Sequence, residues 1–157
     1  MKHLAVDFGK KRLGLAISDD GGRIAVPYEV RERRGLKRDV AELLETARAL
    51  RVERVVFGLP RQAEGAGVHH ESEVRGLAAA LQSAFGEAQM PVEIAWWDER
   101  FSTAEALGNM RSLGISARQG KESVDAHAAS VILQGFLDSQ RRDEPDFDGD
   151  FYDEERA

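Results

Sequence analysis

The sequence contains no cysteine, and this absence excludes several classes of protein at once. Without thiols the chain has no disulfide framework, no cysteine-bound zinc site and no thiol nucleophile. It also lacks a run of about 18 apolar residues, the length that a membrane-spanning helix requires. Its start, MKHLAVDFG, has no apolar segment typical of a secretory signal. We therefore expect a cytoplasmic protein that does not engage a membrane.

The residues that are present suit a single α/β domain of ordinary size. The chain has 157 residues, of which 42% are hydrophobic and 32% are charged. A chain of this length commonly folds as one domain around one core. We expect that domain to span residues 1–138, followed at residues 139–157 by an acidic, disordered tail with too little apolar surface to fold.

Charge is spread unevenly along the chain. Residues 143–157 hold eight acidic side chains and one basic side chain, whereas residues 1–142 hold 21 basic and 20 acidic ones. Basic residues gather at positions 10–12, 31–38 and 118–121. Such clusters on a near-neutral body are compatible with nucleic-acid binding, because phosphates respond to the local field. The acidic tail is either a solvated end or an internal mimic of nucleic acid.

Hydrophobic periodicity predicts secondary structure in the order βββαβαβαα. Strands are expected at His3–Phe8, Arg12–Ser18, residues 23–31, Arg54–Leu59 and residues 92–97, and helices at Leu36–Leu50 and residues 74–85, 103–113 and 123–137. Pro27 indicates an edge strand, and Ser123 is the expected N-cap of the last helix. Trp96 and Trp97 alternate across the fifth strand, so one faces the core and the other is a candidate for stacking on a base. We expect both to pack in the core.

Acidic side chains stand where strands end or helices begin. Asp7 closes the first strand, Asp98 and Glu99 follow the fifth, and Asp125 lies at the start of the last helix. Each has an ordinary structural explanation, as a turn cap or as a charge that favours a helix N-terminus. Because the carboxyl ends of parallel strands meet at one edge, we expect these acids to converge. Carboxylate clusters bind Mg²⁺ or Mn²⁺, which support phosphodiester hydrolysis.

Four motifs, in this order and spacing, resemble one family. They are residues 6–16 (VDFGKKRLGLA), 55–60 (VVFGLP), 97–103 (WDERFST) and 123–133 (SVDAHAASVIL). Together they resemble the YqgF/RuvX family over residues 1 to about 138. The resemblance implies an RNase H-like α/β fold, a five-stranded mixed sheet of order 3-2-1-4-5 with helices on both faces. It implies a metal-dependent nuclease for the 5′ end of precursor 16S rRNA, or a Holliday-junction resolvase-like DNA nuclease.

Carried over position by position, the resemblance implies catalytic roles for Asp7, Glu99 and Asp125, with Asp98 beside them as a further ligand of Mg²⁺ or Mn²⁺. Resolvases are expected to carry an acid at the end of the fourth strand, where this chain has Gly58-Leu59-Pro60. That departure favours general nuclease activity over junction resolution. RNA is the favoured partner and DNA stays open, as does the choice between monomer and homodimer.

Basic side chains near the acids are candidates for holding the phosphates of a nucleic acid. The candidates are Lys10, Lys11, Arg12, Arg100, Arg118 and Lys121.

Two other classes of function remain as alternatives. An actin-like ATPase shares the core and the first-hairpin phosphate loop, but such enzymes need two lobes and this chain is long enough for one. A P-loop is excluded, because the glycines at 9 and 14 are followed by Leu15 and Ala16 instead of Lys and Ser/Thr. A non-catalytic nucleic-acid or ribosome-associated module would keep the fold without the chemistry, and an assay with metal separates it from a nuclease.

Overall fold

The computed structural model describes residues 1–59, 67–98 and 117–143. Its elements, in chain order, are β1 (His3–Phe8), β2 (Arg12–Ser18), β3 (Ala25–Glu32), α1 (Leu36–Leu50), β4 (Arg54–Leu59), α2 (Gly67–Glu87), β5 (Glu93–Asp98) and α4 (Ala117–Asp143). The expected helix at residues 103–113 lies outside the described residues, as does the part of the acidic tail that follows α4.

The strands form one mixed sheet of order β3-β2-β1-β4-β5, which confirms the predicted order. β2 pairs antiparallel with β1 and with β3, whereas β4 pairs parallel with β1 and with β5. The antiparallel strands are joined by short turns, and the parallel strands need crossover connections. β1 and β4 occupy the centre and are buried over most of their length, which accounts for their nearly continuous apolar sequences.

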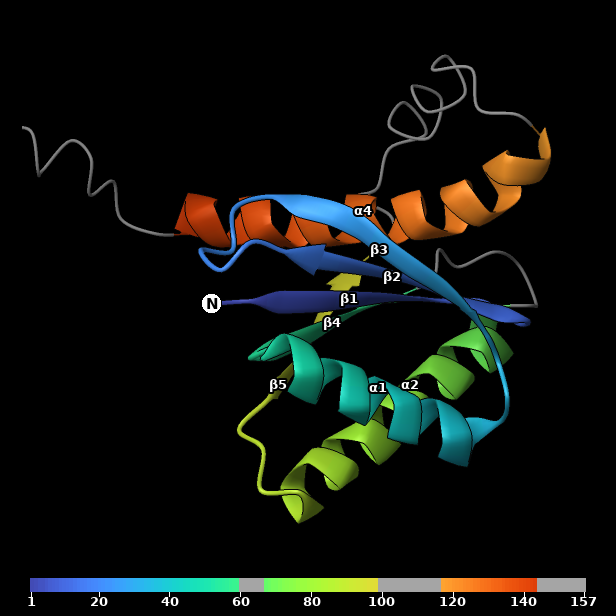
Figure 1. The fold of residues 1–157 in the computed structure, drawn as a ribbon, viewed down its shortest axis with the longest axis horizontal. Coiled ribbons are helices and arrows are strands. Elements are labelled where there is room, and N and C mark those ends of the chain that lie inside the picture. Colours follow the sequence, from blue (N-terminus) through green and yellow to red (C-terminus); the bar gives the residue numbers. More distant parts are fainter. Residues whose placement is uncertain (60–66, 99–116, 144–157) are drawn as a thin grey trace, which may run out of the picture.

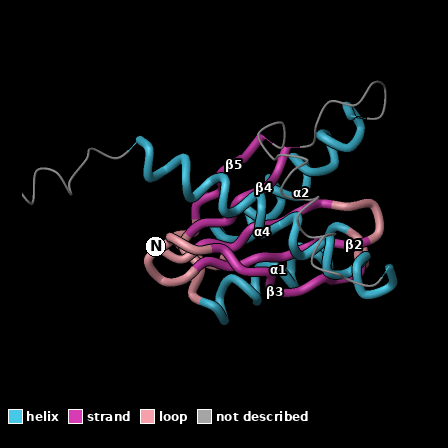
Figure 2. Tube along the Cα trace, turned by 90° about the horizontal axis from the view of Figure 1, so that it is seen from above, coloured by secondary structure: helices cyan, strands magenta, loops and turns pink. Residues whose placement is uncertain are grey.

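Helices cover both faces of this sheet. α4 lies across one face, and α1 and α2 lie side by side on the other (Figure 1); Figure 2 shows the same layers from above. Between the sheet and the α1–α2 layer is a core of large side chains that includes Phe57, Leu43 and Leu81. The core beneath α4 contains small ones such as Ala5 and Ala16. Small side chains at this interface let α4 come close to the sheet.

The first turns of two helices were missed by the periodicity analysis. α2 already includes Gly67 and α4 already includes Ala117, so both start before the expected positions. The prediction that Ser123 is an N-cap is therefore wrong, because Ser123 lies within α4. The missed segments, GVHHESE and ARQGKE, are mostly polar. Polar turns carry no apolar repeat from which a helix can be recognised.

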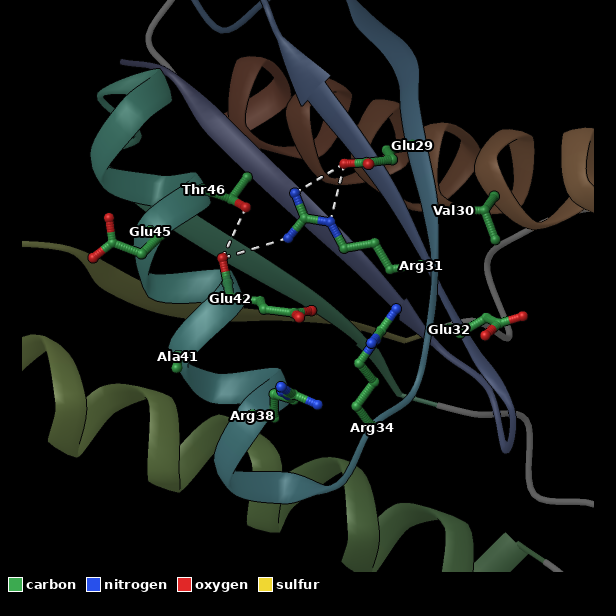
Figure 3. Close-up of a pocket in the computed structure, with 10 residues that line it drawn as sticks. All are labelled: Glu29, Val30, Arg31, Glu32, Arg34, Arg38, Ala41, Glu42, Glu45 and Thr46. Atoms are coloured by element: carbon green, nitrogen blue, oxygen red, sulfur yellow. Dashed lines mark hydrogen bonds and ion pairs between the residues drawn. The ribbon is translucent and has the colours of Figure 1, made fainter.

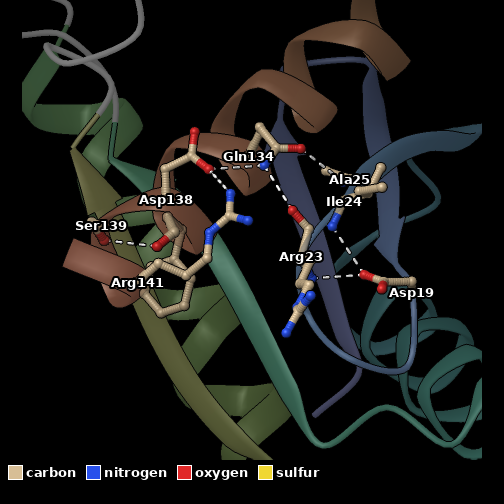
Figure 4. Close-up of polar contacts among 9 residues, drawn as sticks. Asp19, Arg23, Ile24, Ala25, Gln134, Asp138, Ser139 and Arg141 are labelled. Atoms are coloured by element: carbon tan, nitrogen blue, oxygen red, sulfur yellow. Dashed lines mark hydrogen bonds and ion pairs between the residues drawn. The ribbon is translucent and has the colours of Figure 1, made fainter. Parts of the chain in front are cut away.

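β3 begins at Ala25, two residues later than expected. The preceding turn explains the difference, since the Asp19 carboxylate accepts hydrogen bonds from the backbone N–H groups of Arg23, at 2.7 Å, and Ile24, at 2.9 Å (Figure 4). Both bonds lower the pKa of Asp19, and the bond from Ile24 has the larger effect. An aspartate that captures nearby N–H groups competes with strand pairing in this way. β3 is an edge strand, as Pro27 predicts.

One glutamine ties the start of β3 to α4. The Gln134 side-chain oxygen accepts a hydrogen bond from the Ala25 N–H at 2.9 Å, and its nitrogen donates to the Arg23 carbonyl at 3.0 Å (Figure 4). A side-chain amide has both a donor and an acceptor, so one residue can satisfy a backbone group of the edge strand and one of the turn before it. Gln134 thus fixes how α4 is aligned on the sheet.

The two tryptophans of β5 pack on opposite faces, as predicted. The Trp96 ring lies 5.6 Å from that of Phe57 in the core beside α1 and α2. Trp97 packs beneath α4, where a Cβ added to Gly135 would lie 2.8 Å from the indole. The glycine therefore makes room for the large ring.

His3 is a buried histidine held in its neutral form. Its Nδ1 donates to the Met1 carbonyl at 3.0 Å, because a carbonyl can only accept, and its Nε2 accepts from Arg54 at 3.3 Å. Burial is the main cause that lowers the pKa of His3 below the usual 6.5. A proton on Nε2 would remove the acceptor and place two cations side by side.

We expect His3 to make the folded protein less stable at acid pH. Below pH 6.5 His3 becomes protonated in the unfolded chain but stays neutral in the folded chain. The contribution of His3 to the free energy of unfolding is therefore complete above that pH. It is lost as the pH falls toward the lowered native pKa. The slope from one proton is at most about 1.4 kcal/mol per pH unit. Denaturant unfolding from about pH 7.5 to about pH 5 should show a steeper loss in the wild type than in His3→Gln. Equal losses would contradict this role.

Candidate active site

Asp7 is carried by β1 to the face of the sheet that α4 covers. Alternate residues of β1 point to opposite faces. Leu4, Val6 and Phe8 enter the core beside α1 and α2, whereas Ala5 enters the core beneath α4. Asp7 continues the Ala5 side, near the end of the strand and partly exposed. Its backbone is paired across the sheet with Gly14 of β2.

Gly14 allows Asp125 of α4 to lie next to Asp7. A Cβ built on Gly14 would lie 2.2 Å from the carbonyl oxygen of Asp125 and 2.7 Å from its carbonyl carbon. The α4 backbone therefore rests directly on β2, at the position paired with Asp7. Sequence reasoning gave Gly14 no role beyond its place in a motif. A lone glycine inside an alternating strand was the available signal, because it often marks close backbone approach.

The β1–β2 turn supplies basic side chains to the same place. The N–H of Gly9 donates to the carbonyl of Arg12 at 2.9 Å and closes the turn. Arg12 Nε then lies 3.3 Å from Asp125 Oδ2, with the two side chains 28% and 33% exposed. The arginine, predicted as a phosphate contact, thus pairs with a predicted catalytic acid. A partly exposed pair of this kind contributes little to stability but restricts the carboxylate.

These residues line one cavity of about 330 Å³. Its walls are formed by Asp7, Gly9, Lys10, Lys11, Arg12 and Asp125. Two of the predicted acids and three of the predicted phosphate contacts therefore come together, although Asp7 and Asp125 lie far apart in the sequence. Two carboxylates and three basic side chains around one cavity are suited to a polyanion together with a hard cation.

The other predicted site residues either lie away from this cavity or fall outside the residues whose side chains the structure describes. Asp98 ends β5, opposite Leu59 of β4, and by alternation it falls on the Trp96 face, away from Asp7. Glu99 and Arg100 lie outside the described residues, and Arg118 and Lys121 lie in a part of α4 whose side chains are not described. Within the described ranges, no three His, Cys, Asp or Glu side chains are grouped to hold a metal ion.

Comparison with known proteins assigns the family. The family model RuvX, described as Holliday junction resolvase, matches residues 1–139. The chain belongs to the RuvX family. A RuvX relative from Anaeromyxobacter dehalogenans (strain 2CP-C), named "Putative pre-16S rRNA nuclease", is 43% identical over 138 residues, covering 88% of this chain and 97% of the relative. The resemblance seen in the four sequence motifs is thereby confirmed.

Solved structures agree with this RuvX assignment at the level of the fold. T. thermophilus RuvC in complex with a Holliday junction substrate aligns with a TM-score of 0.58 and 18% identity, over 90% of this chain and 96% of RuvC. The fowlpox virus Holliday junction resolvase aligns with a TM-score of 0.55 and 13% identity, over 89% and 99% of the two chains. The predicted RNase H-like fold is confirmed. None of the described helices is long and apolar enough to cross a membrane.

We expect Gly14→Ala to disturb the acids without unfolding the protein. The new methyl group must push α4 away from β2, which typically costs about 1–3 kcal/mol of stability. A displacement of about 1 Å at a reacting group can reduce the rate about a hundredfold. Thermal unfolding and a nucleic-acid cleavage assay would measure both effects.

The matched control is Gly76→Ala in α2, where an added Cβ meets nothing within 4 Å. This change should stabilise the helix by up to about 1 kcal/mol and leave cleavage unchanged. If Gly14→Ala behaved like Gly76→Ala in both assays, the close approach would not govern the site.

Proposed function

We propose that this RuvX protein is a divalent-metal-dependent nuclease that hydrolyses phosphodiester bonds in RNA, acting at the 5′ end of precursor 16S rRNA. The observation that carries the proposal is the shared cavity, which Asp7 and Asp125 line together with Lys10, Lys11 and Arg12. The name of the A. dehalogenans relative supports the substrate. An activity on precursor rRNA would take place in the cytoplasm.

The donor chemistry of the cavity fits Mg²⁺ or Mn²⁺. Asp7 and Asp125 offer carboxylate oxygens, the ligands that these hard cations prefer. We propose Glu99 as the third acid, because strand alternation directs Asp98 toward the opposite face. Bound ions would supply charge stabilisation for the attacking and leaving oxygens of the phosphodiester.

The residues of the chain would position the substrate around these acids. Arg12 holds one oxygen of Asp125, which restricts how that carboxylate turns toward the cavity. Lys10 and Lys11 are exposed on the rim, where each can bind one phosphate as a point charge. Arg100, Arg118 and Lys121 are proposed to extend this contact. The lysines would therefore contribute to affinity, and Arg12 to the geometry of the acids.

A Holliday-junction resolvase is the second candidate. The family description and the RuvC fold support it. Against it, β4 has the sequence RVVFGL and carries no acid at its end, whereas resolvases are expected to carry one there. A non-catalytic nucleic-acid or ribosome-associated module is the third. Cleavage with metal of single-stranded RNA, single-stranded DNA and a four-way junction separates all three candidates.

Asp7→Asn should abolish most of the cleavage while the fold persists. The change keeps the size of the side chain but removes a charged metal ligand, which we expect to lower the rate roughly a hundredfold or more. Cleavage of a precursor 16S rRNA 5′ fragment with Mn²⁺ and with Mg²⁺ measures the effect, and circular dichroism checks the fold.

The matched control is Asp20→Asn, the same change at an exposed carboxylate in the β2–β3 turn. It should cleave at the wild-type rate. Full activity of Asp7→Asn with either metal would rule out the assignment of Asp7. A wild type that binds RNA but cleaves nothing with metal would favour the non-catalytic module.

Lys10→Gln combined with Lys11→Gln should weaken binding in a salt-dependent manner. Two phosphate contacts on a single strand account for a change of about 1.4 in the slope of log affinity against log salt. Fluorescence anisotropy with single-stranded RNA at several salt concentrations measures this slope. A slope equal to that of the wild type would place the bound strand on another surface.

A further inference from the structure

A second cluster of basic residues lies beside the candidate active site. We call residues 33–38, with the sequence RRGLKR, the basic linker; they join β3 to the first turn of α1. The N–H of Arg33 donates to the carbonyl of Lys11 at 2.8 Å. The linker is therefore bonded to the turn that rims the cavity, and its charges continue those of Lys10 and Lys11.

The linker is held in place by a buried carboxylate. Asp39 is 1% exposed and accepts hydrogen bonds from the Arg34 N–H at 2.9 Å and from Arg33 Nε at 3.3 Å. The Arg33 guanidinium also stacks on the ring of Phe8, 4.2 Å from its centroid. The guanidinium of Arg33 is therefore engaged within the protein and is not counted among the exposed cations of the linker. A buried charge pair with additional hydrogen bonds fixes local geometry more than an exposed one does.

The other basic residues of the linker point into solvent. Arg34, Lys37 and Arg38 are exposed, and none has a carboxylate partner in the described part of the chain. Arg31, just before the linker, differs, because its guanidinium pairs with Glu29 at 2.8 Å and donates to the Glu42 carbonyl at 3.4 Å. Figure 3 shows these bonds, and no dashed line reaches Arg34 or Arg38.

Acidic residues lie beside part of this charge. Arg34 and Arg38 line a groove of about 760 Å³ between β3 and α1, together with four glutamates. Of these, Glu29 is paired with Arg31 and Glu45 with Arg48. The linker itself contains no acid. Glu32 and Glu42 also line the groove and offset part of the charge of Arg34 and Arg38, whereas Lys37 does not line it. The linker's exposed cations nevertheless make no ion pair in the described residues, and they stand on a backbone that Asp39 orders.

We propose that the basic linker is a phosphate-binding track for the nucleic-acid strand that flanks the bond to be cleaved. The inference rests on the proposed function and deepens it, since Arg34, Lys37 and Arg38 would continue the row begun by Lys10 and Lys11. A fixed row of unpaired cations binds a sugar–phosphate backbone without reading its bases. Either RNA or DNA can supply such a backbone, and binding assays with both identify the source.

The decisive variant replaces Arg34, Lys37 and Arg38 with Gln. The control replaces Arg23, Arg48 and Arg51 with Gln, which removes the same charge from the β2–β3 turn and the C-terminal end of α1, at the opposite end of the molecule (Figure 1). Binding to single strands of RNA and DNA of about 20 nucleotides is measured against salt, without divalent ions so that no strand is cut.

In the linker variant, the slope of log affinity against log salt should be shallower by about two units than in the wild type. Three phosphate contacts on a single strand contribute roughly 0.7 each to this slope. The control should keep the wild-type slope. The charge-preserving change of Arg34 and Arg38 to Lys should also keep it, since phosphate binding here depends on charge. Equal slopes for the linker and control variants would overturn the proposal, as would a loss of slope in the charge-preserving variant.

Cleavage is measured separately on the wild type, so that the two proposals fail independently. If the wild type cleaves nothing with metal but the linker variant loses slope, the nuclease assignment fails and the track remains. If the wild type cleaves RNA while the linker and control variants bind alike, the track fails and the nuclease remains. A wild type that binds neither strand overturns the track.

Discussion

The geometry of the site depends on the close approach of α4 to β2 at Gly14. Only a glycine leaves room there for the backbone of Asp125, and Gly14 is paired in the sheet with Asp7. One missing side chain therefore brings together two acids from opposite ends of the chain. The small residues Ala5 and Ala16 continue the same contact surface beneath α4. Packing at this interface therefore determines the distance between the acids.

Folding divides the basic residues near the site into two groups. Arg12, Arg31 and Arg33 are each paired with a carboxylate, and they connect the β1–β2 turn, β3 and α1 to their surroundings. Arginine suits this role, because its planar guanidinium can bond in several directions and is weakly hydrated. Lysines such as Lys10 and Lys11 stay exposed. The paired arginines connect these elements, and the exposed lysines leave their charge in contact with solvent.

Periodicity predicted the sheet well and the helix ends less well. The strands β1, β2 and β4 match their expected bounds, because alternating or continuous apolar residues are visible in a short window of sequence. The first turns of α2 and α4 are polar, so no apolar repeat marks them. At β3 the side chain of Asp19 takes N–H groups that a strand would otherwise use. The pattern of apolar residues does not show which backbone N–H groups a side chain will bind.

The sequence by itself determined the order of strands and helices along the chain, the positions of the acids at element ends and the RuvX resemblance, because each depends on local pattern or motif spacing. The order of the strands in the sheet followed only from that resemblance. Only the tertiary structure decided that Arg12 pairs with Asp125, that Gly14 sets the separation of the acids, and that Asp39 orders the linker beside the Lys11 turn. These are contacts between segments distant in sequence. They depend on how closely elements pack, and hydrophobic periodicity carries no information about that distance.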